Sequence, residues 1–294
     1  MASITKANSN NFLRWNKITG GLTLAELQAN GLPTGSTAWD IGNPVFVQEF
    51  NFTSQDAFSK GIHWKPDGTK LYMVGTQNDS VYEYDVSTAW DSSTASYSQL
   101  FDVSTQDTTP TDVRFNGDGD KMYIMGNATD RIYEYDSSTA WDVSTAVINQ
   151  NLSITATDNN PQGLYFNTDG TKMFFSGGQN DTVYEYSLSS AWDISTASAV
   201  ASFSVSSQTT LLSKVFFSTD LSKMFVSSIS FSDITDNRIF EYNVSGDVST
   251  AVYSQTFDPT TLVNYPTGMY FKPDGTRMFL CGDEGTTKLW EYEL

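Results

Sequence analysis

Short apolar runs separated by polar turns recur along this chain, and no stretch of 12 residues within the repeated part has the period of an amphipathic helix. In the first copy the runs cover 61–65, 71–75, 81–84 and 95–102. Pro-Asp-Gly and Gln-Asn-Asp separate the first three of them. Runs of this length that are bounded by turn residues are typical of β-strands. Each copy therefore predicts four short strands.

Three sequence markers repeat in register over about 250 residues. Ser-Thr-Ala-Trp-Asp or a close variant recurs every 51 residues, at Trp39, Trp90, Trp141 and Trp192. An Asp-Gly turn recurs at Asp67, Asp118, Asp169 and Asp274, and it becomes Asp-Leu at Asp220. A Tyr-Glu-Tyr motif or a variant is centred on Glu83, Glu134, Glu185, Glu241 and Glu291. Four strands in each unit of roughly 40–50 residues indicate a propeller blade, so we expect an all-β, five-bladed β-propeller with four-stranded blades.

The fifth repeat stops early, at Leu294, and its continuation lies at the other end of the chain. Residues 36–41 supply the missing Ser-Thr-Ala-Trp-Asp motif, and 44–51 align with the outer strand at 95–102. We therefore expect a propeller over 36–294 whose fifth blade consists of 264–294 plus 36–53. Pairing the two ends of the chain removes an exposed strand edge, which would otherwise invite aggregation.

Residues 1–35 lie outside the repeat and are expected to form an N-terminal arm. The polar segment around Phe12 and Trp15 is followed by a short predicted helix over 24–29, which contains Leu24 and Leu27. These four apolar residues are the candidates for anchoring the propeller to a partner. A disordered tail is the alternative.

The charge of the chain is strongly negative, with 34 acidic and 16 basic residues and a net charge of −18. Such a surface repels nucleic acid and anionic membranes, so neither is an expected partner. No apolar run reaches 18 residues, which predicts no transmembrane segment, and the first residues lack the apolar core of a signal peptide. The single cysteine, Cys281, cannot form an internal disulfide and is expected to fill the core.

The ionisable residues are repeated, which argues against catalysis. Each Tyr-Glu-Tyr glutamate has a basic companion in its own repeat, and strand parity predicts that the two point to opposite faces and pair between neighbouring blades. The basic column contains Lys70, Lys121, Lys172, Lys223 and Arg277. A catalytic pair would be unique, because a ring has one axial site. We expect no enzyme, no catalytic residues and no cofactor.

A glycosidase is the alternative, because some five-bladed propellers are glycosidases that use two or three axial acids. The equivalent inner-strand positions here contain one carboxylate, Asp112, among Gly61, Gly163, Lys214 and Gly268. One acid cannot serve both as acid and as nucleophile or base. The single histidine, His63, is expected to be packed or to face the central channel.

The repeated Trp-Asp loops are the candidate ligand sites. They contain Trp39 and Asp40, Trp90 and Asp91, Trp141 and Asp142, and Trp192 and Asp193. An aromatic face beside a carboxylate suits a sugar ring, and the tachylectin-like lectins, similar in architecture, bind one sugar per blade. The alternative is structural: each tryptophan wedges between blades while each aspartate closes a turn onto Ser-Thr.

Two local features break the repeat. Asn116–Asp120 spaces oxygen ligands like a calcium loop, but it lacks the distal glutamate, so we expect a hairpin turn and no metal site. The fourth copy has lost its tryptophan, and its 227–237 loop is longer than in the other copies. These changes are expected to mark the side that meets a partner.

Taken together, Pro-Asp-Gly-Thr-Lys, Val-Tyr-Glu-Tyr and Ser-Thr-Ala-Trp-Asp resemble repeats in propeller-like structural proteins of marine bacteriophages and of prophages. The resemblance covers 36–294. It implies a non-enzymatic structural protein of the virion, an extracellular particle, as a capsid decoration or a tail or fibre component. Its role would be adhesion or particle stabilisation, with 1–35 binding other virion proteins and a host-surface glycan as a further candidate partner.

Overall fold

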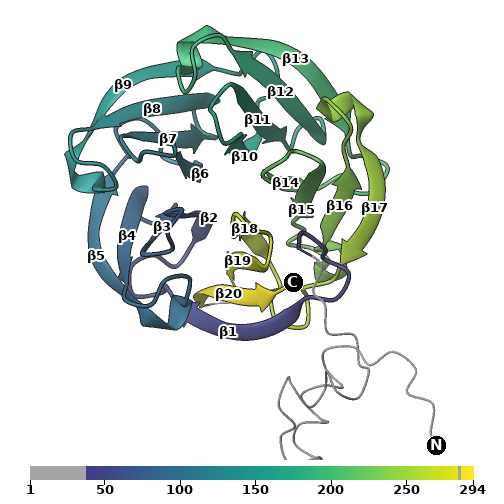
Figure 1. Ribbon diagram of the computed structural model, residues 1–294, viewed down its shortest axis with the longest axis horizontal. Helices are drawn as coiled ribbons and strands as arrows, with labels where there is room; N and C mark the ends of the chain where they lie inside the picture. The colour runs from purple at the N-terminus through teal and green to yellow at the C-terminus, as the bar shows by residue number, and fades with distance from the viewer. Residues whose placement is uncertain (1–37, 284–285) are drawn as a thin grey trace, which may run out of the picture.

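A computed structural model describes residues 38–283 and 286–294, and within them the chain is a five-bladed, all-β propeller, as the repeat predicts (Figure 1). Blade one contains β2 (Ser59–Trp64), β3 (Lys70–Gly75), β4 (Ser80–Val86) and β5 (Ala95–Asp102). Blade two contains β6 (Pro110–Phe115), β7 (Lys121–Gly126), β8 (Arg131–Ser137) and β9 (Ala146–Ser153). Blade three contains β10 (Pro161–Phe166), β11 (Lys172–Gly177), β12 (Thr182–Leu188) and β13 (Ala197–Ser204).

Blade four contains β14 (Leu212–Phe217), β15 (Lys223–Ser228), β16 (Ile239–Asn243) and β17 (Val252–Phe257). Blade five contains β18 (Pro266–Phe271), β19 (Arg277–Asp283), β20 (Thr287–Glu293) and β1 (Val45–Asn51). In every blade the strands are antiparallel, with the first strand at the axis and the last at the rim. The candidate anchor residues Phe12, Trp15, Leu24 and Leu27 lie outside the described residues.

The ring is closed by β1, which pairs antiparallel with β20 (Figure 1). Phe46 lies opposite Tyr292 and Glu49 opposite Trp290. The backbone N–H of Trp39 also donates to the carbonyl of Gly275 at 2.8 Å. The prediction that a strand near the N-terminus completes blade five is confirmed.

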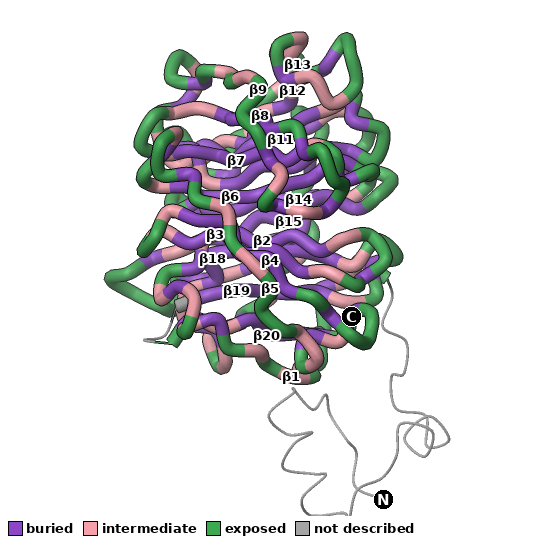
Figure 2. Tube along the Cα trace, turned by 90° about the vertical axis from the view of Figure 1, so that its left-hand side faces the viewer, coloured by how far each residue is buried: buried purple, intermediate pink, exposed green. Residues whose placement is uncertain are grey.

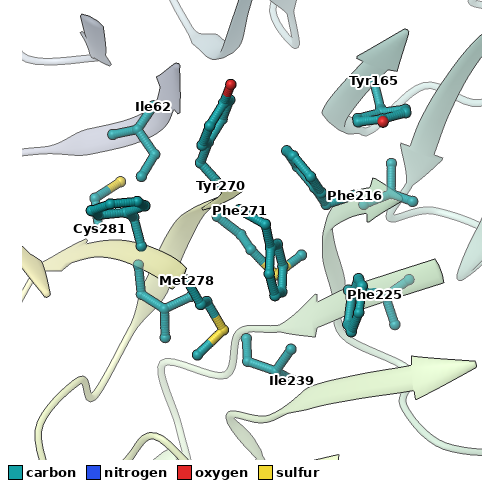
Figure 3. Close-up of a cluster of buried hydrophobic side chains, with 14 of the residues drawn as sticks. Ile62, Tyr165, Phe216, Phe225, Ile239, Tyr270, Phe271, Met278 and Cys281 are labelled. Atoms are coloured by element: carbon teal, nitrogen blue, oxygen red, sulfur yellow. The ribbon is translucent and has the colours of Figure 1, made fainter. Parts of the chain in front are cut away.

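The core lies between the blades, because the inner strands of each blade are covered on both faces by the neighbouring blades (Figure 2). Inner strands consequently need no apolar–polar alternation, and all six residues of β6 are buried. At the interface of blades four and five, the rings of Phe225 and Phe271 stack with centroids 4.4 Å apart, and Phe216 lies 5.3 Å from Phe271 (Figure 3). The outer strands border solvent, and in β1 exposed and half-buried positions alternate.

Short 3-10 turns connect the third and fourth strands of blades one to four. They are η1 (Ser92–Thr94), η2 (Val143–Thr145), η3 (Ile194–Thr196) and η5 (Val248–Thr250). A further turn, η4 (Ile234–Asp236), lies in the long connection between β15 and β16. Among the described residues, no helix has the length and apolar character needed to cross a membrane.

Candidate functional site

The buried glutamate of each third strand joins its own blade to the next one. In blade one, the side chain of Glu83 is 1% exposed and its Oε1 is paired with Lys70 of β3. Its Oε2 accepts a hydrogen bond from Gln99 of β5 at 2.9 Å and another from the backbone N–H of Val143 in blade two at 3.1 Å. A buried carboxylate is stable only when charged and polar partners compensate for lost water, and these three partners supply that compensation.

A cation of the same blade and a group of the next blade bind the equivalent glutamate in every blade, and a glutamine does so in all blades but the third, where Ala201 replaces it. We call Glu83, Glu134, Glu185, Glu241 and Glu291 the seam carboxylates. Glu134 accepts from Lys121 at 2.6 Å, from Gln150 at 2.8 Å and from the backbone N–H of Ile194 at 3.2 Å. The last contact closes the ring: Glu291 of blade five accepts from the Oγ of Ser92 in blade one at 2.8 Å. The repeated acids therefore bind the blades to one another.

The expectation that Lys and Glu of one blade point to opposite faces is wrong. Lys70 lies opposite Asp85, and Tyr72 lies opposite Glu83, in the β3–β4 pairing. Because alternate residues of a strand share a face, Lys70 and Glu83 are diagonal neighbours on one face. The ion pairs consequently form within a blade, and the contact between blades is made by the carboxylate and a backbone N–H.

The aspartates of the Trp-Asp loops belong to the same seams. Asp142 accepts from the backbone N–H and the Oγ of Ser144, at 3.0 and 2.6 Å, and so caps η2. It also accepts from Gln99 of blade one at 2.7 Å. The Ser144 hydroxyl holds the pKa of Asp142 below its ordinary value. Asp40, Asp91 and Asp193 likewise accept from the glutamine of the preceding blade, at 2.6–2.8 Å.

The tryptophans of these loops pack against the turns and the aromatic core. The ring of Trp90, 9% exposed, stacks on Trp64 with centroids 5.3 Å apart and contacts Gly68. Its carbonyl accepts from Arg277 of blade five at 2.8 Å. Trp141 is 8% exposed, whereas Trp39 and Trp192 are partly buried. This geometry has the features of the alternative in which each tryptophan packs between blades and each aspartate closes a turn. The ligand-binding role of the Trp-Asp pairs stays a prediction.

A second polar cluster, formed by Asp112, Arg114 and Lys214, closes the axis. All three side chains are at least 96% buried, and Asp112 Oδ2 lies 3.0 Å from Arg114 Nη2. Arg114 also donates to the carbonyl of Ile62 in blade one at 2.6 Å. Lys214 Nζ donates to the carbonyl of Thr111 in blade two at 2.6 Å and to that of Gln162 in blade three. The cluster thus ties four blades together across the axis.

Burial moves the pKa values of Asp112 and Lys214 toward their neutral forms. Desolvation raises the pKa of Asp112, against the opposing effect of Arg114, and lowers the pKa of Lys214 to about 8. The cluster contains two basic side chains, Arg114 and Lys214, and one acidic side chain, Asp112. The sequence places Asp112 and Lys214 at equivalent inner-strand positions, but it did not predict their cluster with Arg114. The available signal was that Asp112 and Lys214 stand in an inner-strand column whose other members are glycines, while Arg114 stands in a column whose other members are aromatic or histidine.

The cluster separates two hollows on the axis. The aromatic hollow, about 190 Å³, opens on the side of the Asp-Gly turns and is lined by His63, Arg114, Tyr165, Phe216 and Tyr270 among others. The polar hollow, about 230 Å³, opens on the opposite side and is lined by Lys60, Gln162, Lys214 and Phe231 among others. These hollows are the axial positions at which the ring could bind a small molecule.

His63 is packed at the aromatic hollow, with the rings of Phe115 and Tyr270 each 5.3 Å away between centroids. Neither ring nitrogen has a hydrogen-bond partner among the described residues. Burial, reinforced by the charge of Arg114, lowers the pKa of His63 well below 6.5. The imidazole is therefore neutral at physiological pH and has no carboxylate bonded to it that could orient it as a base.

Two further candidates from the sequence, the single cysteine and the calcium-like loop, are parts of the core and of a turn. Cys281 is fully buried, and burial raises the pKa of its thiol to about 11. The Asn116–Asp120 segment forms a hairpin turn in which Asn116 donates to Asp120 at 2.6 Å. Within the described part of the chain, no cluster of three or more His, Cys, Asp or Glu residues is arranged to hold a metal ion.

No protein-family model matches this sequence, and no curated protein matches it either. Solved structures do resemble it. A protein from Lactobacillus plantarum has a TM-score of 0.50 and 12% identity, over 76% of this chain and 64% of that one. A protein from Bacteroides uniformis proposed to be a 6-phosphogluconolactonase has a TM-score of 0.48 and 13% identity, over 74% and 61%. The chain spans less than two thirds of each of these structures. The likeness to the Lactobacillus plantarum protein shows the β-propeller fold alone.

Proposed function

We propose that this protein is a non-enzymatic structural component of a phage particle, in which a rigid propeller serves for attachment or particle stabilisation. A capsid decoration, a tail protein and a fibre component are the positions that fit this role. The proposal has two supports. One is the use of the ionisable residues within the fold, and the other is the resemblance of the repeat motifs.

The non-enzymatic part of the proposal rests on one observation, which is that the seam carboxylates are buried and already bonded within the fold. Each of them has an exposed fraction of 1% or less and is bonded to a cation and to a neighbouring blade. Glycoside hydrolysis needs two accessible carboxyl groups roughly 5–10 Å apart. Asp112 is the single carboxylate on the described inner strands, and it is fully buried against Arg114. The axis therefore offers no such pair.

The virion part of the proposal is supported by the Pro-Asp-Gly-Thr-Lys, Val-Tyr-Glu-Tyr and Ser-Thr-Ala-Trp-Asp motifs. The geometry is compatible with service outside a cell, because the fold needs no disulfide: its one cysteine is free and buried. The charge of −18 favours colloidal solubility in salt water. An extracellular particle is the location that we infer from these features together.

The test is the composition of purified particles. Particles released from the source culture are separated on a density gradient, and each fraction is analysed by mass spectrometry for peptides of this chain and of the major capsid protein. We expect the two to peak in the same fraction at a constant ratio, and an abundant cytosolic protein of the host serves as the contamination control. Absence of the chain from particles that contain capsid protein would remove the virion assignment.

A further inference from the structure

The polar hollow has the composition of a binding site, and neither the seams nor the proposed structural role accounts for it. Lys60, Asn160, Gln162, Lys214, Phe231 and Thr267 contribute to its lining. Its volume of about 230 Å³ is smaller than the roughly 300–1,000 Å³ of sites for drug-sized ligands, so it suits a ligand of the size of one sugar ring.

Lys214, a buried cation, belongs to the lining of the hollow and has unused hydrogen-bonding capacity. Lys214 Nζ has three N–H donors, and the carbonyls of Thr111 and Gln162 accept from two of them. Among the described residues, no acceptor is found for the third. Asp112 is already paired with Arg114, so the positive charge of Lys214 is not fully neutralised inside the protein. Charge in such a low-dielectric setting favours an anionic partner.

The lining itself contains no carboxylate among the described residues, on a chain whose net charge is −18. Its two ionisable side chains, Lys60 and Lys214, are both basic. Negative charge elsewhere on the molecule repels polyanions strongly, whereas it repels a ligand with a single acid group only weakly. The charge pattern therefore favours a small monoanion.

One wall of the hollow is an exposed aromatic ring on the long loop of blade four. Phe231 is 71% exposed, and its ring stacks on Tyr265 with centroids 5.1 Å apart. The loop is held by Asn237, which donates to the carbonyls of Asn264 and Ser230, at 2.5 and 3.2 Å. A fixed, exposed aromatic face beside amides and hydroxyls suits the C–H face of a sugar.

We propose that the polar hollow binds one ring of an acidic sugar of the uronic acid type, with its carboxylate toward Lys214 and its apolar face on Phe231. Gln162 and Thr267 lie within the same lining and provide polar groups for the hydroxyls. This site is single and axial, unlike the Trp-Asp loops, which recur around the ring. It does not depend on a virion location.

The test is calorimetric titration of the full chain with sodium glucuronate, with glucose and with sodium sulfate. We expect glucuronate to bind at least tenfold more tightly than glucose or sulfate. Phe231→Ala should weaken glucuronate binding about 3- to 10-fold, the usual contribution of an aromatic contact. Phe58→Ala is the matched control, because it removes another exposed ring (48% exposed) outside the hollow, and it should leave binding unchanged.

Lys214→Met should abolish the preference for glucuronate over glucose. If this variant fails to fold, the proposal is still tested by the comparison of glucuronate with glucose and sulfate and by the Phe231→Ala variant. Absence of glucuronate binding at millimolar concentration would overturn the proposal, as would equal affinity for glucose. Equal affinity for sulfate would reduce the hollow to a site for an adventitious ion only and would overturn it too.

Discussion

A Cβ atom added to Gly68 would lie 2.6 Å from Cγ of Trp90, so the Asp-Gly turn and the Trp-Asp loop of one blade share a single packing site. The glycine has a φ of +76°, which side chains rarely adopt. The same contact recurs in Gly119 with Trp141, Gly170 with Trp192, and Gly275 with Trp39. Blade four has no tryptophan here, and Leu221 with a φ of +60° replaces the glycine. The Asp-Gly turn and the Trp-Asp loop, which are two markers of the repeat, therefore form one packing contact.

Gly68→Ala should destabilise the propeller strongly. A side chain in the left-handed region costs about 1–2 kcal/mol, and overpacking a filled site costs about 1–3 kcal/mol more. We expect the free energy of unfolding, measured in urea, to fall by about 2–5 kcal/mol. Gly117→Ala is the control, because no heavy atom lies within 4 Å of its added Cβ and its φ is not positive. Equal losses in the two variants would contradict the shared packing site.

Ring closure can be tested with a disulfide between β1 and β20. Val45 and Glu293 lie opposite each other and both are exposed, and opposite residues of antiparallel strands have Cα separations that suit a disulfide. The double variant Val45→Cys, Glu293→Cys should form the bond and gain about 1–4 kcal/mol in unfolding free energy over its reduced form. Cys281 is fully buried and should not interfere. Failure to oxidise in the folded state would contradict the pairing of β1 with β20.

Lys214 should give the stability a characteristic pH dependence. Burial lowers its pKa to about 8 from an ordinary 10.5, so between these values the unfolded chain binds more protons than the folded one. Stability contributed by this group therefore rises with pH across that window. The charged and titratable groups that act on it are Asp112, Arg114, Lys60 and Cys281.

The measurement is the free energy of unfolding of the wild type and of Lys214→Met from pH 7 to pH 10. The difference between the two should shift in favour of the wild type as the pH rises above about 8. Lys70 and Lys121, whose pKa values are raised, are present in both proteins and cancel in the difference. Parallel curves would show that Lys214 does not titrate in this range.

The fold could be predicted from sequence because the repeat supplies an internal alignment. The 81–84 run, for example, corresponds to β4 at Ser80–Val86, and the 44–51 segment to β1 at Val45–Asn51. Gln48 and Gln99 align in sequence and also act alike, since each donates to the glutamate of its own blade and to the aspartate of the next. Because the same contacts recur in each blade, the residues that make them recur at equivalent positions of the sequence.

The contacts of the site could not be predicted in the same way. Parity along one strand cannot show that Lys70 and Glu83 share a face, because this depends on the register between β3 and β4. Lys214 reaches the carbonyl of Thr111, about a hundred positions away, only because the ring brings blades two and four together at the axis. Residues that differ between repeats form the axial cluster and the polar hollow, and an alignment of repeats treats such residues as exceptions.

The central claim is that the repeated carboxylates serve the seams between blades, and Glu134→Ala tests it. The variant removes bonds to Lys121, Gln150 and Ile194, so the free energy of unfolding in urea should fall by about 2–4 kcal/mol. Glu49→Ala, which removes an exposed carboxylate paired with Lys288, should lose no more than about 1 kcal/mol. If Glu134→Ala were as stable as Glu49→Ala, the seam role of these carboxylates would be contradicted, and their use in binding or chemistry would have to be reopened.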